Sequence, residues 1–312
     1  MTGSVKPGAN ELFASVVVPH YNDRIRLETC LASLEDQTFP RDRYEIIVTD
    51  NGTPGGIADV ASRFSRVRFI EEKRKGAAHA RNAAIAVAGS AAFAFIDSDC
   101  VADPAWLEEG LRALEHADLV GGAIQLSARD QVAPTPVEVF EMMFAFRQQQ
   151  YIEKQNFAVT ANLFAKKMIF DAIGGFRHGL PEDTDWCRRA VAAGYTIRFA
   201  PKARVLHPAR HDWTELVAKW DRLVWEKYNA MRPQPLFAPR WVILALLVGA
   251  SILPHSVRLL LGGPETGRPE TGGSEIKGSE IGWRRRLAAV GVLTRIRLWR
   301  TRRMLALLGS SS

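Results

Sequence analysis

Short apolar runs and helical spacing alternate through the first hundred residues. Runs rich in β-branched and aromatic residues occupy 15–19, 44–49, 67–70 and 92–96, which is the pattern of buried strands. Between these runs apolar residues recur at helical spacing, and Asp23 stands where it can cap the first helix. Strands that alternate with helices of about a dozen residues predict βαβ units and a mostly parallel sheet. The sequence therefore predicts an α/β fold.

Further elements are expected after the strand at 92–96. They complete the predicted α/β body near residue 235. In chain order they are a helix over 105–114, a strand over 119–124, a helix over 137–151, a helix from the acids at 182–185 to Gly194, short strands over 196–199 and 203–206, and a helix over 213–228.

The chain changes character beyond residue 235. Residues 236–261 form an apolar segment whose uninterrupted run, 241–254, is 14 residues long. A membrane-spanning helix needs about 20 apolar residues, and His255 and Arg258 interrupt the extension of this run. We therefore expect a buried or interfacial helix, with insertion into a membrane as the alternative.

Two more segments follow the apolar one. Residues 262–282 contain near-repeats of Pro-Glu-Thr-Gly and Gly-Ser-Glu-Ile, and they predict a flexible polar linker. Within the last segment, 283–312, residues 283–308 can form a basic helix; a solvated, disordered tail is the alternative. At about 100° per residue, one side of this helix collects Trp283, Leu287, Val290, Leu298, Leu305 and Leu308.

Charge is distributed unevenly along the chain. Residues 255–312 carry eleven Lys and Arg residues against four Glu residues, which accounts for the whole net charge of +7. The rest of the chain is neutral overall, and this argues against a nucleic-acid groove in the α/β body. A neutral body with a basic tail predicts contact between the tail and an anionic surface, with no nucleic-acid partner.

The cysteines indicate a reducing compartment. Cys30, Cys100 and Cys187 are far apart, odd in number and outside any Cys-x-x-Cys pattern. Small buried apolar roles suit them better than disulfides or zinc ligation. The first 15 residues contain no apolar run preceded by basic residues, so we expect no signal peptide.

Two carboxylates one residue apart follow the strand at 92–96. In open α/β sheets, ligands bind outside the carboxyl ends of the strands. Asp97 and Asp99 stand at that place and offer oxygen ligands to Mg²⁺ or Mn²⁺, while a diphosphate can supply further oxygens. The alternative involves no ligand: Asp97 caps a helix and Asp99 is solvated.

Six motifs in a fixed order resemble a family 2 glycosyltransferase of the GT-A fold. The resemblance spans about residues 13–230 and does not cover the tail, so 1–235 is the expected catalytic domain. Each motif alone is weak, and their order and spacing make the resemblance specific. They are Val-Val-Val-Pro-His-Tyr-Asn at 16–22, Thr-Asp-Asn-Gly at 49–52, Lys-Gly-Ala-Ala-His-Ala-Arg-Asn at 75–82, Asp-Ser-Asp at 97–99, Glu-Asp-Thr-Asp at 182–185, and His207.

The resemblance places a nucleotide-sugar donor at the ends of the first two strands. It implies that Asp50 accepts a hydrogen bond from the base while Tyr21, near Pro19 in the donor site, stacks on the base. Lys75 and Arg81 lie before and within a helix start, where cations suit phosphate. The alternatives are that Asp50 is a simple turn residue and that Arg81 braces its own loop.

The resemblance also implies a divalent metal, Mn²⁺ or Mg²⁺, as cofactor. Asp99 would bind the metal that bridges the diphosphate, and Asp97 would approach the ribose. His207 would be another ligand of the metal or of phosphate, although a lone histidine is more often structural.

Asp183 is the implied catalytic base. An acceptor hydroxyl that attacks the anomeric carbon must lose a proton, and a positioned carboxylate can accept it. The metal and nearby cations would stabilise the leaving nucleoside diphosphate, and a one-step displacement inverts the anomeric centre. Glu182 and Asp185 share the predicted helix start, where acids also simply complement the helix dipole.

One departure from the family concerns processivity. Processive polysaccharide synthases of this family carry Gln-x-x-Arg-Trp after the base, together with several membrane spans. Residues 219–225 lack that motif, so we expect transfer of one sugar per encounter. The expected acceptor is a hydroxyl, on a lipid-linked or cell-envelope glycan, and the basic tail would hold a peripheral enzyme at the cytoplasmic face of the membrane.

Three other classes of protein have a related fold. A nucleotidyltransferase needs a Gly-rich phosphate loop with Arg after the first strand, and a Rossmann dehydrogenase needs G-x-G-x-x-G there; residues 19–22 fit neither. A non-catalytic nucleotide-sugar-binding protein on the same fold is the remaining alternative. The acids at 97, 99 and 183 argue against it, because such a protein has no use for a base and a metal ligand.

Overall fold

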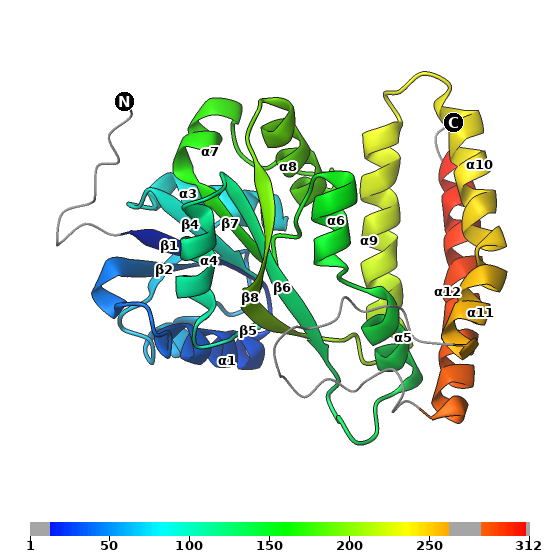
Figure 1. Cartoon of the computed structure of the whole chain (residues 1–312), viewed down its shortest axis with the longest axis horizontal. Coiled ribbons are helices and arrows are strands. Elements are labelled where there is room, and N and C mark those ends of the chain that lie inside the picture. Colours follow the sequence, from blue (N-terminus) through cyan, green and yellow to red (C-terminus); the bar gives the residue numbers. More distant parts are fainter. Residues whose placement is uncertain (1–12, 262–281, 310–312) are drawn as a thin grey trace. The chain divides into compact units, whose positions relative to one another are not determined.

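The structure is a computed structural model of the chain, and it describes residues 13–261 and 282–309 (Figure 1). The described residues form two compact units. The first, the α/β unit, comprises residues 13–125, 148–178 and 182–207; the second, the helical unit, comprises 126–147, 179–181, 208–261 and 282–309. The expected division at residues 235, 261 and 282 stays a prediction, and the linker expected at 262–282 lies almost entirely outside the described residues.

An eight-stranded sheet runs through the first unit in the order β3-β2-β1-β4-β7-β6-β8-β5. The four strands that begin the chain are mutually parallel, as βαβ units require. They are β1 (Ala14–His20), β2 (Tyr44–Asp50), β3 (Arg68–Glu71) and β4 (Ala92–Ile96).

The second half of the sheet is antiparallel where its pairings are described. Strand β7 pairs antiparallel with both β4 and β6, and β5 pairs antiparallel with β8, so the sheet is mixed. These strands are β5 (Val101–Ala102), β6 (Leu119–Ser127), β7 (Asn162–Lys166) and β8 (Ile197–Pro208).

Helices cover both faces of the sheet, which is why its strands read as continuous apolar runs (Figure 1). Val16 and Val18 of β1 join one core cluster, and Val17 joins the other. The first face packs against α1 (Arg24–Glu35) and α4 (Trp106–Leu114). The second packs against α3 (Ala77–Val87), α7 (Lys167–Ile173) and α8 (Glu182–Ala192). Two short elements occur between strands in the sequence, η1 (Arg41–Arg43) before β2 and α2 (Ala58–Ala61) before β3.

Two expected elements differ from the structure. The helix expected over 137–151 is two helices, α5 (Pro136–Phe144) and α6 (Gln148–Gln155). Phe146 separates them with a φ of 52°, a left-handed conformation that no helix can contain. The two short strands expected within 196–206 are one strand, β8.

The helical unit is built around α12 (Trp283–Gly309), which confirms the helix expected from residue 283. It packs with α5, α9 (Trp213–Met231), α10 (Phe237–Ala250) and α11 (Ile252–Leu261). One core cluster joins Phe140, Leu216 and Leu293. The other joins Tyr228, Trp241 and Met304, and the Trp241 indole donates to the Met304 carbonyl oxygen at 2.7 Å.

Helix α12 carries two apolar stripes. The stripe that packs into the unit consists of Ala289, Leu293, Ile296, Met304 and Leu307. The stripe expected from the sequence lies elsewhere on the helix, and four of its members, Trp283, Leu287, Leu298 and Leu305, are exposed. A helix in water normally buries its apolar residues against other parts of the protein. The exposed members of the second stripe therefore indicate a contact with something outside the described residues.

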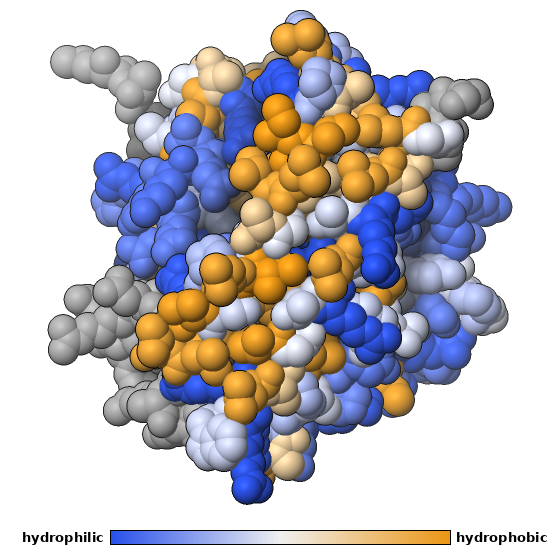
Figure 2. Space-filling view, turned by 90° about the vertical axis from the view of Figure 1, so that its right-hand side faces the viewer, coloured by the Kyte–Doolittle hydropathy of each residue, from blue (hydrophilic) through white to orange (hydrophobic). Residues whose placement is uncertain are grey.

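Helices α10 and α11 also expose apolar side chains. The segment Phe237–Leu261 is long and apolar enough to cross a membrane, and only 17% of its most apolar stretch is buried. Figure 2 shows hydrophobic side chains gathered on one face of the molecule, with hydrophilic ones between and around them. The exposed members on these two helices are Ile243, Leu246, Leu247, Leu253, Val257, Leu260 and Leu261.

Candidate active site

Polar residues meet where the parallel strands end. His20 at the end of β1 lies in register with Asp50 at the end of β2, and Asp97 follows the last residue of β4. Parallel strands place their carboxyl ends at the same edge of a sheet. Tyr21, Asp50 and Asp97, which the sequence assigned to the donor, therefore share one edge.

Asp50 is a buried carboxylate held by its own turn. The Thr53 hydroxyl donates to it at 2.6 Å, and the Thr53 backbone N–H donates at 3.2 Å. A carboxylate has about four acceptor positions, so these bonds orient Asp50 and still leave it able to accept from a ligand. Thr53 was not singled out from the sequence, although an Asx-type turn after Asp50 is a recognisable signal.

Lys75 lies beside Tyr21. Its Nζ atom is 4.3 Å from the centre of the Tyr21 ring, and it donates to the carbonyl oxygens of Asn51 and Gly52 at 3.2 and 3.3 Å. Tyr21 is 54% exposed, so its ring presents a free face for stacking. The aromatic ring and the cation expected to contact one donor are thus neighbours.

Asn51 connects the second strand to the loop that carries Lys75. Its side-chain amide donates to the carbonyl oxygens of Glu72 and Arg74 at 2.7 and 2.8 Å, and its side-chain oxygen accepts from the Gly76 N–H at 2.7 Å. Three hydrogen bonds fix the loop before α3 against the end of β2. The sequence did not identify this role, since nothing in the local pattern shows that the two segments meet.

Arg81 is buried between two carboxylates. Its guanidinium donates to Asp97 at 2.6 Å and also pairs with Glu182. These charges, with Asp183 beside them, raise the pKa of Arg81 in spite of its burial. Next to it, Asn82 exchanges two hydrogen bonds with the backbone of Phe176. Arg81 therefore has partners within the protein, whereas the sequence assigned it to phosphate.

Asp183 is a carboxyl group at this edge with a raised pKa. It follows Glu182 at the start of α8, and its carboxylate accepts from the Thr184 N–H at 2.7 Å. Burial and the neighbouring charge of Glu182 raise the pKa of Asp183 to about 6, against opposing contributions from Thr184 and Arg81. A carboxylate with a pKa of about 6 can accept a proton from a substrate near neutral pH.

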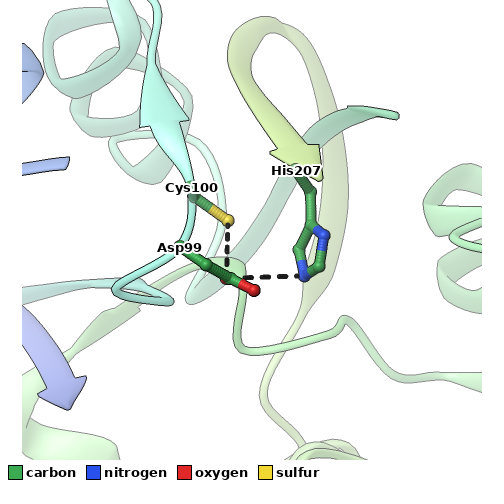
Figure 3. Close-up of side chains that lie close together, drawn as sticks. All are labelled: Asp99, Cys100 and His207. Atoms are coloured by element: carbon green, nitrogen blue, oxygen red, sulfur yellow. Dashed lines mark hydrogen bonds and ion pairs between the residues drawn. The ribbon is translucent and has the colours of Figure 1, made fainter. Parts of the chain in front are cut away.

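The pairing of β5 with β8 brings His207 to Asp99 and Cys100. Val101 lies opposite Leu206 in this antiparallel pair, so the residues that flank them also meet. His207 Nε2 is 3.7 Å from a carboxylate oxygen of Asp99, and the three side chains point toward one another (Figure 3). Their candidate ligand atoms all lie within 4.8 Å of each other.

The donor set fits a divalent cation. Two ligands of one ion can be about 4 Å apart, because each bond is about 2.1 Å long, and 3.7 Å satisfies this limit. Burial raises the pKa of the Cys100 thiol well above its usual value, so the oxygen of Asp99 and the nitrogen of His207 are the suitable donors. A carboxylate with an imidazole suits Mn²⁺ better than Mg²⁺, which prefers oxygen alone.

Residues 15–174 match the model of Glycosyl transferase family 2. The chain is a family 2 glycosyltransferase. The Glycosyltransferase AglE of Haloferax volcanii is 31% identical to this glycosyltransferase over 257 residues, which are 80% of this chain and 84% of the relative. This match reaches well beyond the residues that the family model covers.

Solved structures confirm that the glycosyltransferase has the GT-A fold. The mannosyltransferase PcManGT of Pyrobaculum calidifontis, solved with GDP-Man and Mn²⁺, superposes with a TM-score of 0.58 at 18% identity over 95% of this chain and 90% of its own. Residues 1–349 of S. aureus TarS, solved with UDP-GlcNAc, give a TM-score of 0.51 at 17% identity, over 76% of this chain and 72% of that one. These neighbours show the fold, and their ligands are their own.

Proposed function

We propose that this glycosyltransferase moves one sugar from a nucleoside diphosphate sugar to an acceptor hydroxyl, with inversion of the anomeric centre. The observation that carries the proposal is Asp183, a carboxyl group with a pKa of about 6 on the same sheet edge as the expected donor residues. A base poised near neutral pH is what a single displacement by a hydroxyl requires. A protein that only binds nucleotide sugars has no need for it.

The donor lies along the ends of β1, β2 and β4. Tyr21 stacks on the base, next to Pro19, and Asp50 accepts a hydrogen bond from the base, with Thr53 holding its carboxylate in place. Lys75, beside Tyr21, contacts the diphosphate. The nucleotide sugars bound in the PcManGT and TarS structures support a donor of this class.

Arg81 acts here through other residues. Its ion pairs with Asp97 and Glu182 fix the carboxylate expected at the ribose and the first turn of α8. Because Glu182 precedes Asp183, the same guanidinium positions the base. We therefore assign Arg81 a positioning role in place of the phosphate contact expected from the sequence.

Asp99 and His207 would hold the divalent ion, and we propose Mn²⁺ as the one that suits them. When bound, the ion offsets the negative charge that develops on the leaving diphosphate. The presence of Mn²⁺ in the PcManGT structure supports this assignment.

The chain's own residues carry out the displacement. The acceptor oxygen bonds to the anomeric carbon from the side opposite the diphosphate, whose bond to that carbon breaks. Asp183 takes the proton that the acceptor oxygen loses, while the ammonium of Lys75 stabilises the departing diphosphate. Attack from the opposite face inverts the configuration.

The test combines donor turnover with stereochemistry. Nucleotide sugars of each base are incubated with the enzyme, acceptor alcohols and Mn²⁺, and release of nucleoside diphosphate is measured with and without a chelator. NMR coupling constants then compare the anomeric configuration of donor and product. Retained configuration would contradict the single displacement, and absence of turnover with every donor would favour a non-catalytic binding protein.

The helical unit supports a proposal for the acceptor and the location. The exposed apolar residues of α10 and α11 and the second stripe of α12 suit the headgroup region of a bilayer, and arginines of α12 suit anionic lipid. We propose a peripheral enzyme at the cytoplasmic face, acting on a lipid-linked or cell-envelope glycan. The alternative is that α10 and α11 insert into the hydrocarbon core of the bilayer.

A further inference from the structure

A small cavity opens on the helical unit between α9 and α12. It has a volume of about 250 Å³ and is lined by Trp213, Arg295, Leu298, Trp299 and Arg302. The last four lie at helical spacing on one face of α12, with the two arginines one heptad apart and the two apolar residues between them. The cavity therefore has apolar walls and a cation at each end.

The two arginines have no carboxylate to neutralise them within residues 13–261 and 282–309. Both are exposed to solvent, and Arg295 also stacks over the ring of Trp213, with 3.9 Å from its guanidinium carbon to the ring centre. Arg303 of the same helix differs, since it forms an ion pair with Asp221 at 2.5 Å. A guanidinium that stacks on an aromatic ring keeps the hydrogen-bond donors at its edge for a ligand.

The surroundings of the cavity add positive charge. Residues 283–309 contain eight arginines and no acid. Arg300 stacks over Trp220 at 3.7 Å, and burial together with Arg297 lowers the pKa of Arg300 to about 9, which still leaves it charged at neutral pH. No carboxylate in the described part of the chain pairs with either Arg297 or Arg300, so their charge adds to that of Arg295 and Arg302.

The residues that line the cavity favour one class of anion over others. A free phosphate gains nothing from Leu298 and Trp299, and a nucleotide, whose base can stack on Trp299, leaves Leu298 without an apolar partner. A lipid offers a phosphate for the guanidinium groups and an acyl chain for the apolar walls. Tryptophan is also the residue that favours the boundary between headgroups and hydrocarbon.

We propose that this cavity is a binding site for the phosphate headgroup of an anionic membrane lipid, held by Arg295 and Arg302 with its chain against Leu298 and Trp299. The proposal rests on the membrane contact proposed above and adds a defined lipid site to it. It is independent of the sugar-transfer chemistry.

The test uses the full-length enzyme and vesicles of phosphatidylcholine with or without phosphatidylglycerol. The variant Arg295→Gln/Arg302→Gln is compared with Arg284→Gln/Arg285→Gln, which removes the same charge from α12 outside the cavity. We expect the cavity pair to lose about tenfold more affinity for phosphatidylglycerol vesicles than the control pair, because only it loses charge-assisted hydrogen bonds to the headgroup. Equal losses would overturn the proposal and leave a diffuse electrostatic contact.

Three controls accompany this test: single variants of Arg302, competition by phosphate, and stabilisation by nucleoside diphosphate. Arg302→Gln alone removes an exposed side chain and guards against misfolding of the double variant, and Arg302→Lys should restore part of the binding. Inorganic phosphate at millimolar concentration should not displace the vesicles, and displacement would mean that the site binds free phosphate. Stabilisation of each variant by nucleoside diphosphate and Mn²⁺ should be unchanged. Loss of vesicle binding therefore reports on the lipid site, and loss of this stabilisation reports on the donor site.

Discussion

The Nη2 atom of Arg81 lies 2.6 Å from a carboxylate oxygen of Asp97 and so ties α3 to the end of β4. The same guanidinium reaches Glu182 at the start of α8. One buried cation therefore connects the residue expected at the ribose with the residue that precedes the proposed catalytic base.

Replacement of this cation should affect stability and acidity together. Arg81→Gln leaves two partly buried carboxylates unpaired, and we expect the free energy of unfolding in urea to fall by about 3 kcal/mol. Because Arg81 lowers the pKa of Asp183, the acid limb of the pH–rate profile should also move to higher pH. Arg81→Lys should recover part of both effects. Weaker binding of nucleoside diphosphate with unchanged stability and pH profile would instead support the phosphate contact.

Asp183→Asn should separate binding from turnover. We expect donor affinity to persist and turnover to fall by about 10²–10⁴, the range for loss of a general base. In the unmodified enzyme, turnover should decline as the pH falls below about 6, because the base becomes protonated there. Glu182→Gln and Asp185→Asn serve as controls from the same helix start. Activity in Asp183→Asn combined with its loss in either control would place the base elsewhere.

The same substitution should make the protein more stable. A folded-state pKa of about 6 lies above the ordinary value of 3.8, so the ionised carboxylate opposes folding at pH 7. Asp183→Asn removes this penalty, and its melting temperature should exceed that of the parent at pH 7. The advantage should shrink as the pH falls from about 6 to below the ordinary pKa of 3.8, where the parent carboxyl is protonated in both states. A pH-independent difference would show that Asp183 is not perturbed as described.

Mn²⁺ binding should depend on Asp99. At about 100 times the dissociation constant, a ligand stabilises the folded state by about 2.7 kcal/mol, which a thermal shift detects. Nucleoside diphosphate with Mn²⁺ should raise the melting temperature of the parent and have no Mn²⁺-dependent effect on Asp99→Ala. His207→Gln should weaken the response, whereas Asp171→Asn, an exposed acid on α7, should not. A full response in Asp99→Ala would remove it from the metal site.

The sequence predicts the part of the fold that depends on local pattern. The parallel strands β1 to β4 and the polar residues after them follow from apolar periodicity and strand order. The approach of His207 to Asp99 does not, because it depends on the pairing of β5 with β8, and β5 is only two residues long. The motif order of the family placed His207 among the candidates, but its distance from Asp99 required the structure.

The partners of Arg81 and the buried face of α12 could not be predicted from the sequence, for physical reasons. Arg81 stands at a helix start, where phosphate and carboxylate are equally suitable partners, and only tertiary structure supplied the carboxylates. Helix α12 has apolar residues on two sides, and periodicity alone cannot say which side packs inward. Most of the stripe found from the sequence is exposed, with Leu298 among the exposed members.

Helix α12 also bears on how the helical unit is completed. Its contacts with α5 join segments about 150 residues apart in the sequence. Closing so long a loop costs conformational entropy, and the packing of the whole unit must offset that cost. A chain that is cut or terminated before residue 283 therefore leaves the inward faces of α5, α9 and α10 open to water. Such a product would be a substrate for chaperones and proteases, so shortening the chain is no route to a soluble form of this enzyme.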